Sequence, residues 1–569
     1  MCFAADENTV VIRLVTDKSV NKAVLMCSDP FINELTRKKS WYGKPDEMKL
    51  EMELENGLVW SSRIEPPFKR LQYYFKLFCN DREYLLFDNK LCTEEDKDNS
   101  FTLYYKFPWI NPSDVIAPPQ WVRDTVWYQI MPDRFCRSVN SAELPSLLPW
   151  GGPVRDPYRA YYGGDLRGIT ERLPYLRELG IGGIYLTPVF LSGSYHRYNT
   201  FDYKTIDPLL GSEEDMRELV RTAHELGIRV MLDGVFNHCG TEFFAWRDVC
   251  EKGRDSEYYD WFFINREDFL SPRFDTADKR YFTFSFWAGM PKLNTNNPEV
   301  IGYFTDICSY WVREWDIDGI RFDVGDEVSH TFLRELRIAL KKLKKDIFLL
   351  GEMWFDAIKW LDGTEYDSVM NYPMSECIND FTRKKSVTAR DFMYALNRCL
   401  LMYPEQVEQV LFNFLDTHDT TRVAEECKGN TDLIIQKLAM LFTMPGTPCI
   451  YYGTEIALKG RDPSDNRSCM PWDGIEQGKY DGMLKEVKKL VAIRNTNSFI
   501  SGTNFEYIMH DEPRLLHYVR KDPETGRSIG VCINAGDSHA DIKAEGRLLY
   551  SNLYNGERLE MNGTLIYEC

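Results

Sequence analysis

The sequence predicts an α/β protein built on a (β/α)8 TIM barrel with a β-domain on each side. From about residue 122 to residue 499, short apolar runs alternate with amphipathic helical patterns. Eight such runs occur, which is the number of strands in a closed parallel barrel. Polar side chains gather where these runs end, and in such barrels chemistry lies at the C-terminal ends of the strands.

The N-terminal β-domain is expected over residues 1–118. Residues 9–16, 49–64, 70–79, 83–87 and 101–107 form short alternating runs that predict the strands of a β-sandwich. Residues 108–121 are rich in proline and predict a linker.

The barrel is expected in two parts, residues 119–238 and 297–499. Its strands are predicted within residues 125–135, 180–190, 228–238, 316–324, 347–354, 366–374, 409–419 and 447–455. Helices are predicted at residues 212–227, 298–315, 330–345, 389–403, 432–444 and 483–496. Roughly sixty residues separate the third strand from the next helix, too many for a simple loop, so residues 239–296 are expected to form an inserted domain B.

Residues 500–569 return to short strands and predict a C-terminal β-sandwich.

Composition excludes some classes of function. The net charge of −18 argues against a nucleic-acid partner, whose phosphates would be repelled. No apolar run reaches the length of a membrane span, and the first residues lack a basic segment followed by an apolar one. The 15 cysteines are scattered, odd in number and without a CxxC pair, which is typical of a reducing compartment. We therefore expect a cytoplasmic protein without a membrane partner. An aromatic content of 14% suits carbohydrate binding, but large cores explain it equally well.

Charged residues cluster at the predicted strand ends. Arg321 and Asp323 share one strand face, and an adjacent arginine is expected to lower the pKa of the aspartate and keep it ionised. Taken alone, this pair could equally be a structural ion pair. Other strands end in, or lead into, acids and histidines: Asp233, Asn237 and His238; Glu352 and Trp354; His418 and Asp419; and His196, Tyr198 and Asp202. Since buried charges need partners, their convergence on one rim predicts an active site.

The residue types at this rim favour glycoside hydrolysis. Such chemistry uses paired carboxylates. The sequence contains no GxSxG nucleophile elbow near a histidine and an acid, no HExxH motif and no clustered Cys/His metal pattern. The glycines of residues 161–169 precede a helix but lack the Gly-Lys-Ser/Thr ending of a phosphate loop.

The motifs at the strand ends resemble those of a known family. Residues 231–238 (MLDGVFNH), 319–323 (GIRFD), 351–354 (GEMW) and 414–419 (FLDTHD) resemble the four signature regions of the α-amylase superfamily, glycoside hydrolase family 13. Residues 290–294 (MPKLN) are similar to a fifth region in its neopullulanase, cyclomaltodextrinase and maltogenic amylase group. The likeness covers essentially the whole barrel, and the leading β-domain suits this group.

The resemblance implies a retaining α-glucan hydrolase. It would cleave α-1,4-glucosidic bonds of cyclodextrins, maltooligosaccharides and pullulan by double displacement. Asp323 would be the nucleophile, Glu352 the acid and base, and Asp419 the residue that holds the distorted sugar. The resemblance also implies a set of substrate-binding residues: His196, Tyr198, His238, Arg321, Trp354, His418 and Arg467. For Tyr198 and Trp354, a packed aromatic at the barrel rim is the alternative.

The sequence departs from its relatives in two loops. Many relatives carry an Asn/Asp-rich calcium loop after the DRF motif, whereas residues 136–152 here are poor in carboxylates and only Asp165 matches well. Calcium needs six or more oxygens, so we expect no required cofactor and no metal site, with calcium left as the alternative. In residues 460–472 the spacing from Asp462 to Arg467 is one residue longer than in relatives, so only Arg467 is expected to grip a sugar.

Partners and alternative functions follow from the same likeness. In relatives, the N-terminal domain commonly caps the active site of a second subunit, so we expect a homodimer acting on α-glucan oligosaccharides and cyclodextrins. The alternative is that residues 1–118 are a lone carbohydrate-binding-like module on a monomer. A transglycosylase or isomerase of the same fold, acting on maltooligosaccharides or maltose, is the alternative. A non-catalytic barrel is disfavoured, because such relatives lose the three carboxylates that are present here.

Overall fold

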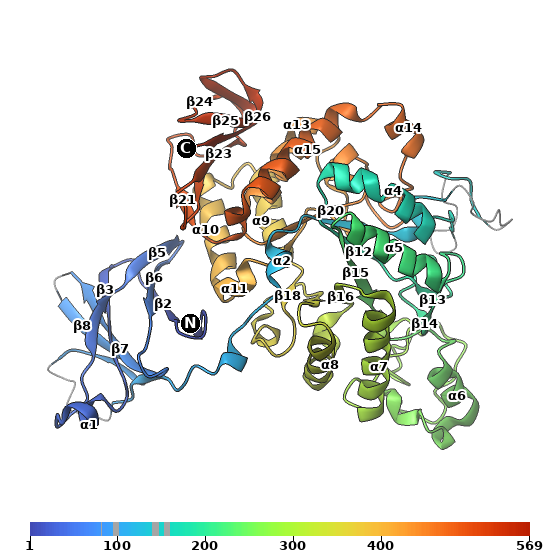
Figure 1. Ribbon diagram of the computed structural model, residues 1–569, viewed down its shortest axis with the longest axis horizontal. Coiled ribbons are helices and arrows are strands. Elements are labelled where there is room, and N and C mark those ends of the chain that lie inside the picture. Colours follow the sequence, from blue (N-terminus) through green and yellow to red (C-terminus); the bar gives the residue numbers. More distant parts are fainter. Residues whose placement is uncertain (81, 95–101, 139–146, 153–159) are drawn as a thin grey trace. The chain divides into compact units, whose positions relative to one another are not determined.

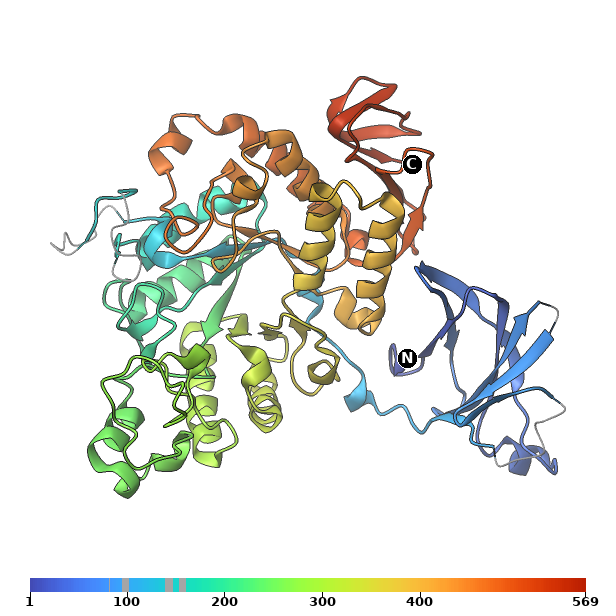
Figure 2. The ribbon, with the colours of Figure 1, turned by 180° about the vertical axis from the view of Figure 1, so that it is seen from behind.

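The computed structural model describes residues 1–80, 82–94, 102–138, 147–152 and 160–569. The chain divides into two compact units. The first contains residues 1–117 together with residues 390–408, and the second contains residues 118–389 and 409–569. Figure 1 labels the elements, and Figure 2 shows them from behind. None of the described helices is both long and apolar enough to cross a membrane.

The N-terminal unit is the expected β-sandwich. One sheet has the order β1 (Cys2–Ala4), β2 (Val10–Thr16), β6 (Gly57–Ile64) and β5 (Lys49–Leu54). The other has the order β4 (Lys44–Glu47), β3 (Val20–Ser28), β7 (Leu71–Cys79), β8 (Arg82–Phe87) and β9 (Lys90–Cys92), with β10 (Tyr105–Phe107) also paired to β7. Alternate residues from both sheets, among them Ile12, Trp60, Leu25 and Phe75, pack into one core. The sequence prediction missed β3 and merged β5 with β6, which are joined at a Glu55–Asn56 turn.

Two helices of residues 390–408 cluster with this sandwich, namely most of α10 (Ala389–Leu401) and α11 (Glu405–Glu408). Arg13 of β2 connects the two parts: its Nη2 donates to Glu51 over 2.7 Å and its Nη1 to the buried Glu408 over 3.3 Å. Burial raises the pKa of Glu408 to about 8, although Arg13 opposes this.

The second unit contains the predicted barrel. Its parallel strands lie in the order β18 (Ser368–Val369), β17 (Phe348–Gly351), β16 (Gly319–Phe322), β15 (Arg229–Gly234), β12 (Gly183–Leu186), β11 (Trp127–Ile130), β20 (Thr447–Tyr451) and β19 (Phe412–Asn413). A parallel bridge between Met370 and Phe412 joins the two ends and closes the barrel.

Helices cover the outside of the barrel strands (Figures 1 and 2). They are α4 (Leu166–Leu179), α5 (Glu213–Glu225), α7 (Pro298–Trp315), α8 (His330–Leu343), α9 (Tyr372–Arg383), α13 (Thr431–Thr443) and α15 (Asp481–Thr496). Local sequence sets their ends. For α5, Ser212 and Asp215 form a reciprocal capping box, and for α7, the Asn297 side chain accepts from Glu299 N ahead of a proline at the first helical position.

Along each barrel strand, the residues of the core and those of the site lie on the same inward face, because side chains alternate between the two faces. Trp127, Tyr185, Met231, Phe348 and Phe412 fill the barrel interior. On the same faces, further toward the C-terminal ends, Asp233 follows Met231 and Glu352 follows Leu350, each two residues later. Asp233 is in register with Arg321, and Arg321 with Leu350. An apolar layer therefore lies directly beneath a charged one.

Two insertions border the barrel mouth. The antiparallel pair β13 (Phe190–Ser192) and β14 (Thr200–Ile206) holds the turn that carries His196 and Tyr198. Residues 239–296 contain α6 (Phe244–Lys252), short 3-10 turns and isolated β-bridges such as Phe262 with Leu293.

The C-terminal residues form a sheet domain, as expected. The strands are β21 (Phe505–Tyr507), β22 (Leu515–Lys521), β23 (Ser528–Asn534), β24 (Ala540–Asp541), β25 (Arg547–Tyr554) and β26 (Arg558–Glu568). All belong to one hydrogen-bonded network in which β26 pairs with β23, β24 and β25. Leu515, Cys532, Leu559 and Leu565 form its core.

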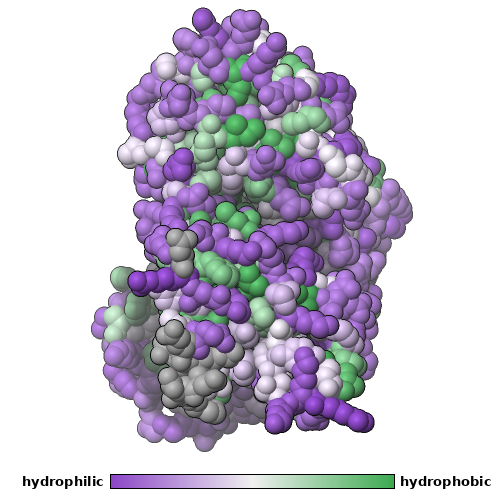
Figure 3. Space-filling model, turned by 90° about the vertical axis from the view of Figure 1, so that its left-hand side faces the viewer, coloured by the Kyte–Doolittle hydropathy of each residue, from purple (hydrophilic) through white to green (hydrophobic). Residues whose placement is uncertain are grey.

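Hydrophilic side chains dominate the face of the molecule drawn in Figure 3, where apolar residues form small separate groups. Such scattered exposure is ordinary for a protein surface.

Candidate active site

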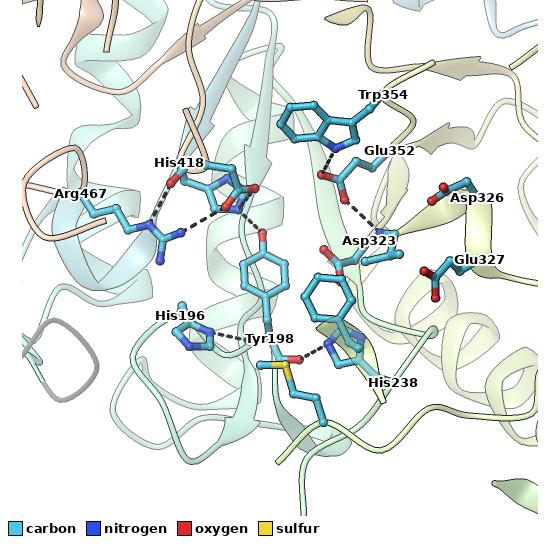
Figure 4. Close-up of a pocket in the computed structure, with 14 residues that line it drawn as sticks. His196, Tyr198, His238, Asp323, Asp326, Glu327, Glu352, Trp354, His418 and Arg467 are labelled. Atoms are coloured by element: carbon cyan, nitrogen blue, oxygen red, sulfur yellow. Dashed lines mark hydrogen bonds and ion pairs between the residues drawn. The ribbon is translucent and has the colours of Figure 1, made fainter. Parts of the chain in front are cut away.

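A cavity of about 420 Å³ opens at the C-terminal ends of the barrel strands (Figure 4). Nine of the ten residues to which the resemblance gives a role line it: His196, Tyr198, His238, Asp323, Glu352, Trp354, His418, Asp419 and Arg467. The tenth, Arg321, is fully buried at its floor. The structure thus brings together side chains from the ends of β16 and β17, from the segments after β15, β19 and β20, and from the β13–β14 turn.

Arg321 organises the floor of this cavity. Its Nη1 donates to Asp233 over 2.9 Å and to Asp323 over 2.9 Å. Its Nη2 lies 2.6 Å from Glu352 Oε2, an ion pair without hydrogen-bond alignment. One guanidinium therefore faces three buried carboxyl groups, and negative charge is in excess.

This excess of negative charge bears on the pKa that the sequence predicted for Asp323. Burial raises the pKa of the Asp323 carboxyl well above its usual value. Arg321 lowers it, as the sequence suggested, but Glu352, Asp233 and Asp419 add further upward shifts. The prediction that Arg321 lowers this pKa overall is therefore wrong. Burial and the neighbouring carboxyl groups together therefore favour the protonated form of Asp323.

Glu352 is held by the turn that follows β16. The Val324 amide donates to Glu352 Oε2 over 3.0 Å, and the Gly325 amide donates to the Glu352 carbonyl over 3.2 Å. To form this turn, Val324 adopts a φ of 47°, which is strained for a β-branched residue. Trp354, 55% exposed, stacks on Tyr372 with ring centroids 3.8 Å apart, and its indole nitrogen lies 3.4 Å from Glu352 Oε1. Glu352 thus has both backbone and aromatic support.

Asp419 also lines the cavity and has a partner for each of its carboxylate oxygens. His418 Nε2 is 3.0 Å from Oδ2, and Arg467 Nη2 donates to Oδ1 over 3.2 Å. Although burial opposes it, His418, Arg467 and Arg321 together hold the pKa of this carboxyl well below its usual value. Asp419 is therefore ionised at neutral pH.

Tyr198 is fixed by hydrogen bonds in the centre of the site. Its hydroxyl donates to Asp233 Oδ2 over 2.9 Å and accepts from His418 Nε2 over 2.7 Å. Gln129 Nε2 lies 2.8 Å from His418 Nδ1, which makes Nδ1 the acceptor and Nε2 the protonated nitrogen. The N–H of His418 is therefore directed toward Tyr198 and Asp419.

The two remaining histidines are neutral. Burial lowers the pKa of His196 and of His238 to about 3. His196 Nδ1 accepts from the Tyr198 amide over 3.2 Å, which leaves its Nε2–H able to donate to a ligand. His238 Nε2 instead donates to the Tyr198 carbonyl over 3.0 Å, and its ring stacks on Phe284. His196 is thus the better placed of the two to donate to a sugar hydroxyl.

Sequence reasoning missed several cavity residues. Phe284 and Met290 reach the cavity from the inserted domain, and Asp326 and Glu327 reach it from the turn after β16. Met290 and the Asp326–Glu327 pair lie in or beside quoted motifs and could have been found there. Phe284 has no such signal, because its approach depends on the fold of residues 239–296.

The two divergent loops can be placed only in part. Residues 139–146 of the expected calcium loop lie outside the described residues. Asp165 caps α4: its Oδ1 accepts from the Gly168 amide over 2.6 Å and its Oδ2 from the Ser138 hydroxyl over 2.7 Å. Within the described ranges, no group of three His, Cys, Asp or Glu side chains could hold a metal ion. Asp462 is exposed and accepts from the Ser464 amide, whereas Arg467 lines the cavity.

Comparison with known proteins identifies related chains. Residues 129–488 match the model of the alpha amylase catalytic domain, and residues 1–111 match that of the alpha amylase N-terminal ig-like domain. The chain is 39% identical to a cyclomaltodextrinase of Geobacillus thermopakistaniensis over 98% of this chain and 93% of that protein. It is 38% identical to an intracellular maltogenic amylase of Bacillus subtilis over 90% of this chain and 85% of that protein.

A solved structure of a cyclomaltodextrinase has a TM-score of 0.88 to this one. It is 31% identical in sequence, and the match covers 100% of this chain and 96% of the other. These matches agree with the group expected from the motifs and with the predicted three-part layout.

Proposed function

This chain belongs to the alpha-amylase family of glycoside hydrolases, and from this premise we propose that it hydrolyses α-1,4 bonds of cyclodextrins, short maltooligosaccharides and pullulan with retention of configuration. That it is a glycosidase of α-glucans follows from the family and its relatives. The observation that carries the mechanism is the contact of Asp323 and Glu352 with neighbouring nitrogens of one guanidinium. It supports a short spacing of the two carboxyls, and retaining enzymes need about 5–5.5 Å.

In the first step, Asp323 attacks the anomeric carbon as the glycosidic bond breaks. Glu352 gives its proton to the departing oxygen, so that the leaving sugar departs neutral and a β-glycosyl ester forms on Asp323. This step requires that Glu352 carries the proton and Asp323 the negative charge before the glycosidic bond breaks. Arg321 then balances the charge of Asp323 before attack.

In the second step, Glu352 acts as the base. It accepts a proton from water, the resulting hydroxide oxygen attacks the anomeric carbon, and the ester bond to Asp323 breaks. The product has the α-configuration, and both carboxyls return to their starting states. Neither relative named above carries a transglycosylase or isomerase name, so water is the preferred acceptor.

Asp419 is proposed to bind hydroxyls of the sugar at the cleavage point. Its anionic state and its fixed oxygens suit hydrogen bonds that strengthen as the ring flattens toward an oxocarbenium ion. His196 is proposed to donate to the same sugar, Tyr198 to contact its face, and Trp354 to contact the departing sugar.

We also propose a cytoplasmic homodimer that needs no metal ion. The fifteen cysteines are scattered, odd in number and without a CxxC pair, and the relative from Bacillus subtilis is named intracellular. The N-terminal unit exposes Phe31, Leu35, Phe68 and Leu91, which offers apolar surface for a second copy. If that domain caps the partner's cleft, small or cyclic glucans would enter more readily than starch.

Product analysis by chromatography tests this function. The full chain is incubated with β-cyclodextrin, soluble starch, pullulan, maltotriose and sucrose. We expect maltose and glucose from β-cyclodextrin and maltotriose, slower release from starch, and no reaction with sucrose. Products from sucrose, or maltose converted to another disaccharide, would favour the alternative activity instead.

A further inference from the structure

Tyr195 lies next to the catalytic cavity without lining it. Only 2% of its surface is exposed, and it follows β13 in the turn that ends with Tyr198. Its hydroxyl accepts a hydrogen bond from Arg467 Nη1 over 3.0 Å. The mechanism above gives this buried phenol no role.

The contact with Tyr195 completes a set of three that fixes Arg467. Arg467 Nη1 donates to Tyr195, Nη2 to Asp419 over 3.2 Å, and Nε to the His418 carbonyl over 2.9 Å. Each of the three guanidinium nitrogens thus has its own partner, and a planar guanidinium held at three points cannot rotate without breaking bonds.

Asp419 depends on this orientation. Its side chain is 36% exposed, whereas that of Arg467 is 10% exposed. The terminal torsion of an aspartate is soft, so the direction of the carboxylate is set by its partners. Oδ1 is held by Arg467 and Oδ2 by His418, and the Arg467 contact is already long at 3.2 Å. A small displacement of Arg467 would release Oδ1.

Tyr195 is itself held firmly. The Arg134 guanidinium lies 4.4 Å from the ring centroid of Tyr195 and 4.4 Å from that of Tyr162, so it is sandwiched between them. The Tyr195 carbonyl accepts from Arg197 Nη1 over 2.6 Å. A buried, stacked ring with a fixed backbone presents its hydroxyl at one position.

We propose that Tyr195 is a positioning residue that sets the orientation of Arg467 and, through it, the direction in which Asp419 presents its carboxylate to the sugar. This inference rests on the role proposed above for Asp419. It predicts that the Tyr195 hydroxyl contributes to turnover although it touches neither substrate nor reacting atoms.

The test compares Tyr195→Phe with Tyr452→Phe. Both changes remove one buried hydroxyl, but that of Tyr452 donates to the Ser468 carbonyl over 2.7 Å and does not contact Arg467. Activity is measured on 4-nitrophenyl α-maltoside and α-glucoside, and thermal unfolding is measured for both variants. For Y195F we expect kcat to fall roughly 10- to 100-fold, because a small misplacement of Asp419 relative to the reacting sugar slows the chemical step. We expect KM to stay within about twofold of wild type. For Y452F we expect kcat within about twofold of wild type at a similar loss of stability.

A double-mutant cycle separates positioning from a merely structural role. In an Arg467→Ala background, Y195F should have no further effect on kcat, because its route to Asp419 is already lost. An equal loss in both backgrounds, or wild-type kcat in the single variant, overturns the inference. A larger fall in kcat on the maltoside than on the glucoside also overturns the inference, since Arg467 would then act on a more distant sugar. If the wild-type chain cleaves no α-glucan, the proposed function fails, whatever the variants do.

Discussion

Replacing Asp323 by asparagine should abolish turnover and at the same time stabilise the fold. The change removes the proposed nucleophile with little change of shape. It also removes one of three carboxyl groups that face Arg321, whose Nη1 keeps its bonds of 2.9 and 3.0 Å to Asp233. The two effects have separate causes, so they can be measured independently.

The stability effect follows from the raised pKa of Asp323. An aspartate in the unfolded chain titrates near about 3.9. Because the folded chain binds this proton more tightly, the carboxyl stabilises the fold below the unfolded pKa, and this contribution is lost as the pH rises through the folded pKa. Asparagine avoids that loss. Substitutions that relieve strain of this kind typically add about 0.5–2 kcal/mol, and we expect about 1–2 kcal/mol in the free energy of unfolding at neutral pH.

Urea unfolding at pH 8 and at pH 4 measures this effect. The midpoint for Asp323→Asn should exceed that of wild type at pH 8, and the gap should shrink at pH 4 as the wild-type carboxyl gains its proton. A variant less stable than wild type at pH 8 would refute the reasoning, because the Arg321–Asp323 contact would then outweigh burial and repulsion.

The catalytic effect is read from kcat on maltotriose and from maltotriose binding. Loss of covalent catalysis should cost several kcal/mol, so kcat should fall below about a thousandth of wild type while binding is largely kept. Higher residual turnover would show that Asp323 is not the nucleophile.

Three further outcomes are expected. The first product seen by NMR should be the α-anomer, and a β-anomer would contradict the double-displacement mechanism. EDTA should leave activity unchanged, whereas inactivation reversed by Ca²⁺ would reveal a site built from other oxygens. Light scattering should report a dimer whose interface buries on the order of 2,000 Å² or more, and a chain starting near Pro118 should lose its preference for cyclodextrins over starch. A monomeric full-length protein, or an unchanged preference, would make the N-terminal domain an independent binding module.

Local patterns were enough to predict the barrel. The run from Ile228 to His238 and its counterparts are apolar on both faces, as parallel strands require, and the helix predicted at residues 298–315 has those bounds in the structure. Caps such as Ser212 fix helix ends through contacts within a few residues. The prediction missed strand β3 because its sequence, VNKAVLMCS, does not alternate between polar and apolar residues.

The residues of the site could be predicted from the sequence, but the pKa of Asp323 and the hydrogen bonds of the site could not. Alternation along β16 places Arg321 and Asp323 on one face, and this can be read from the sequence. The pKa of Asp323 cannot, because it depends on Glu352 and Asp233 from neighbouring strands and on burial. The hydrogen bonding of His238 could not be predicted either, because its N–H donates to the Tyr198 carbonyl, which lies in a different loop.

The charged layer of the barrel explains why the site can work only with its exact complement of partners. Apolar residues such as Met231 and Leu350 close the barrel beneath Asp233 and Glu352, so these carboxyls cannot be solvated from below. Arg321 offsets part of that cost but faces three carboxyl groups, and burial and the remaining repulsion raise the pKa of Asp323. A retaining hydrolase needs two carboxyls close together, and the shared contact of Asp323 and Glu352 with Arg321 supports such a spacing. The crowding of carboxyl groups that costs the fold stability is thus the same arrangement that brings the proposed nucleophile and the proposed acid together.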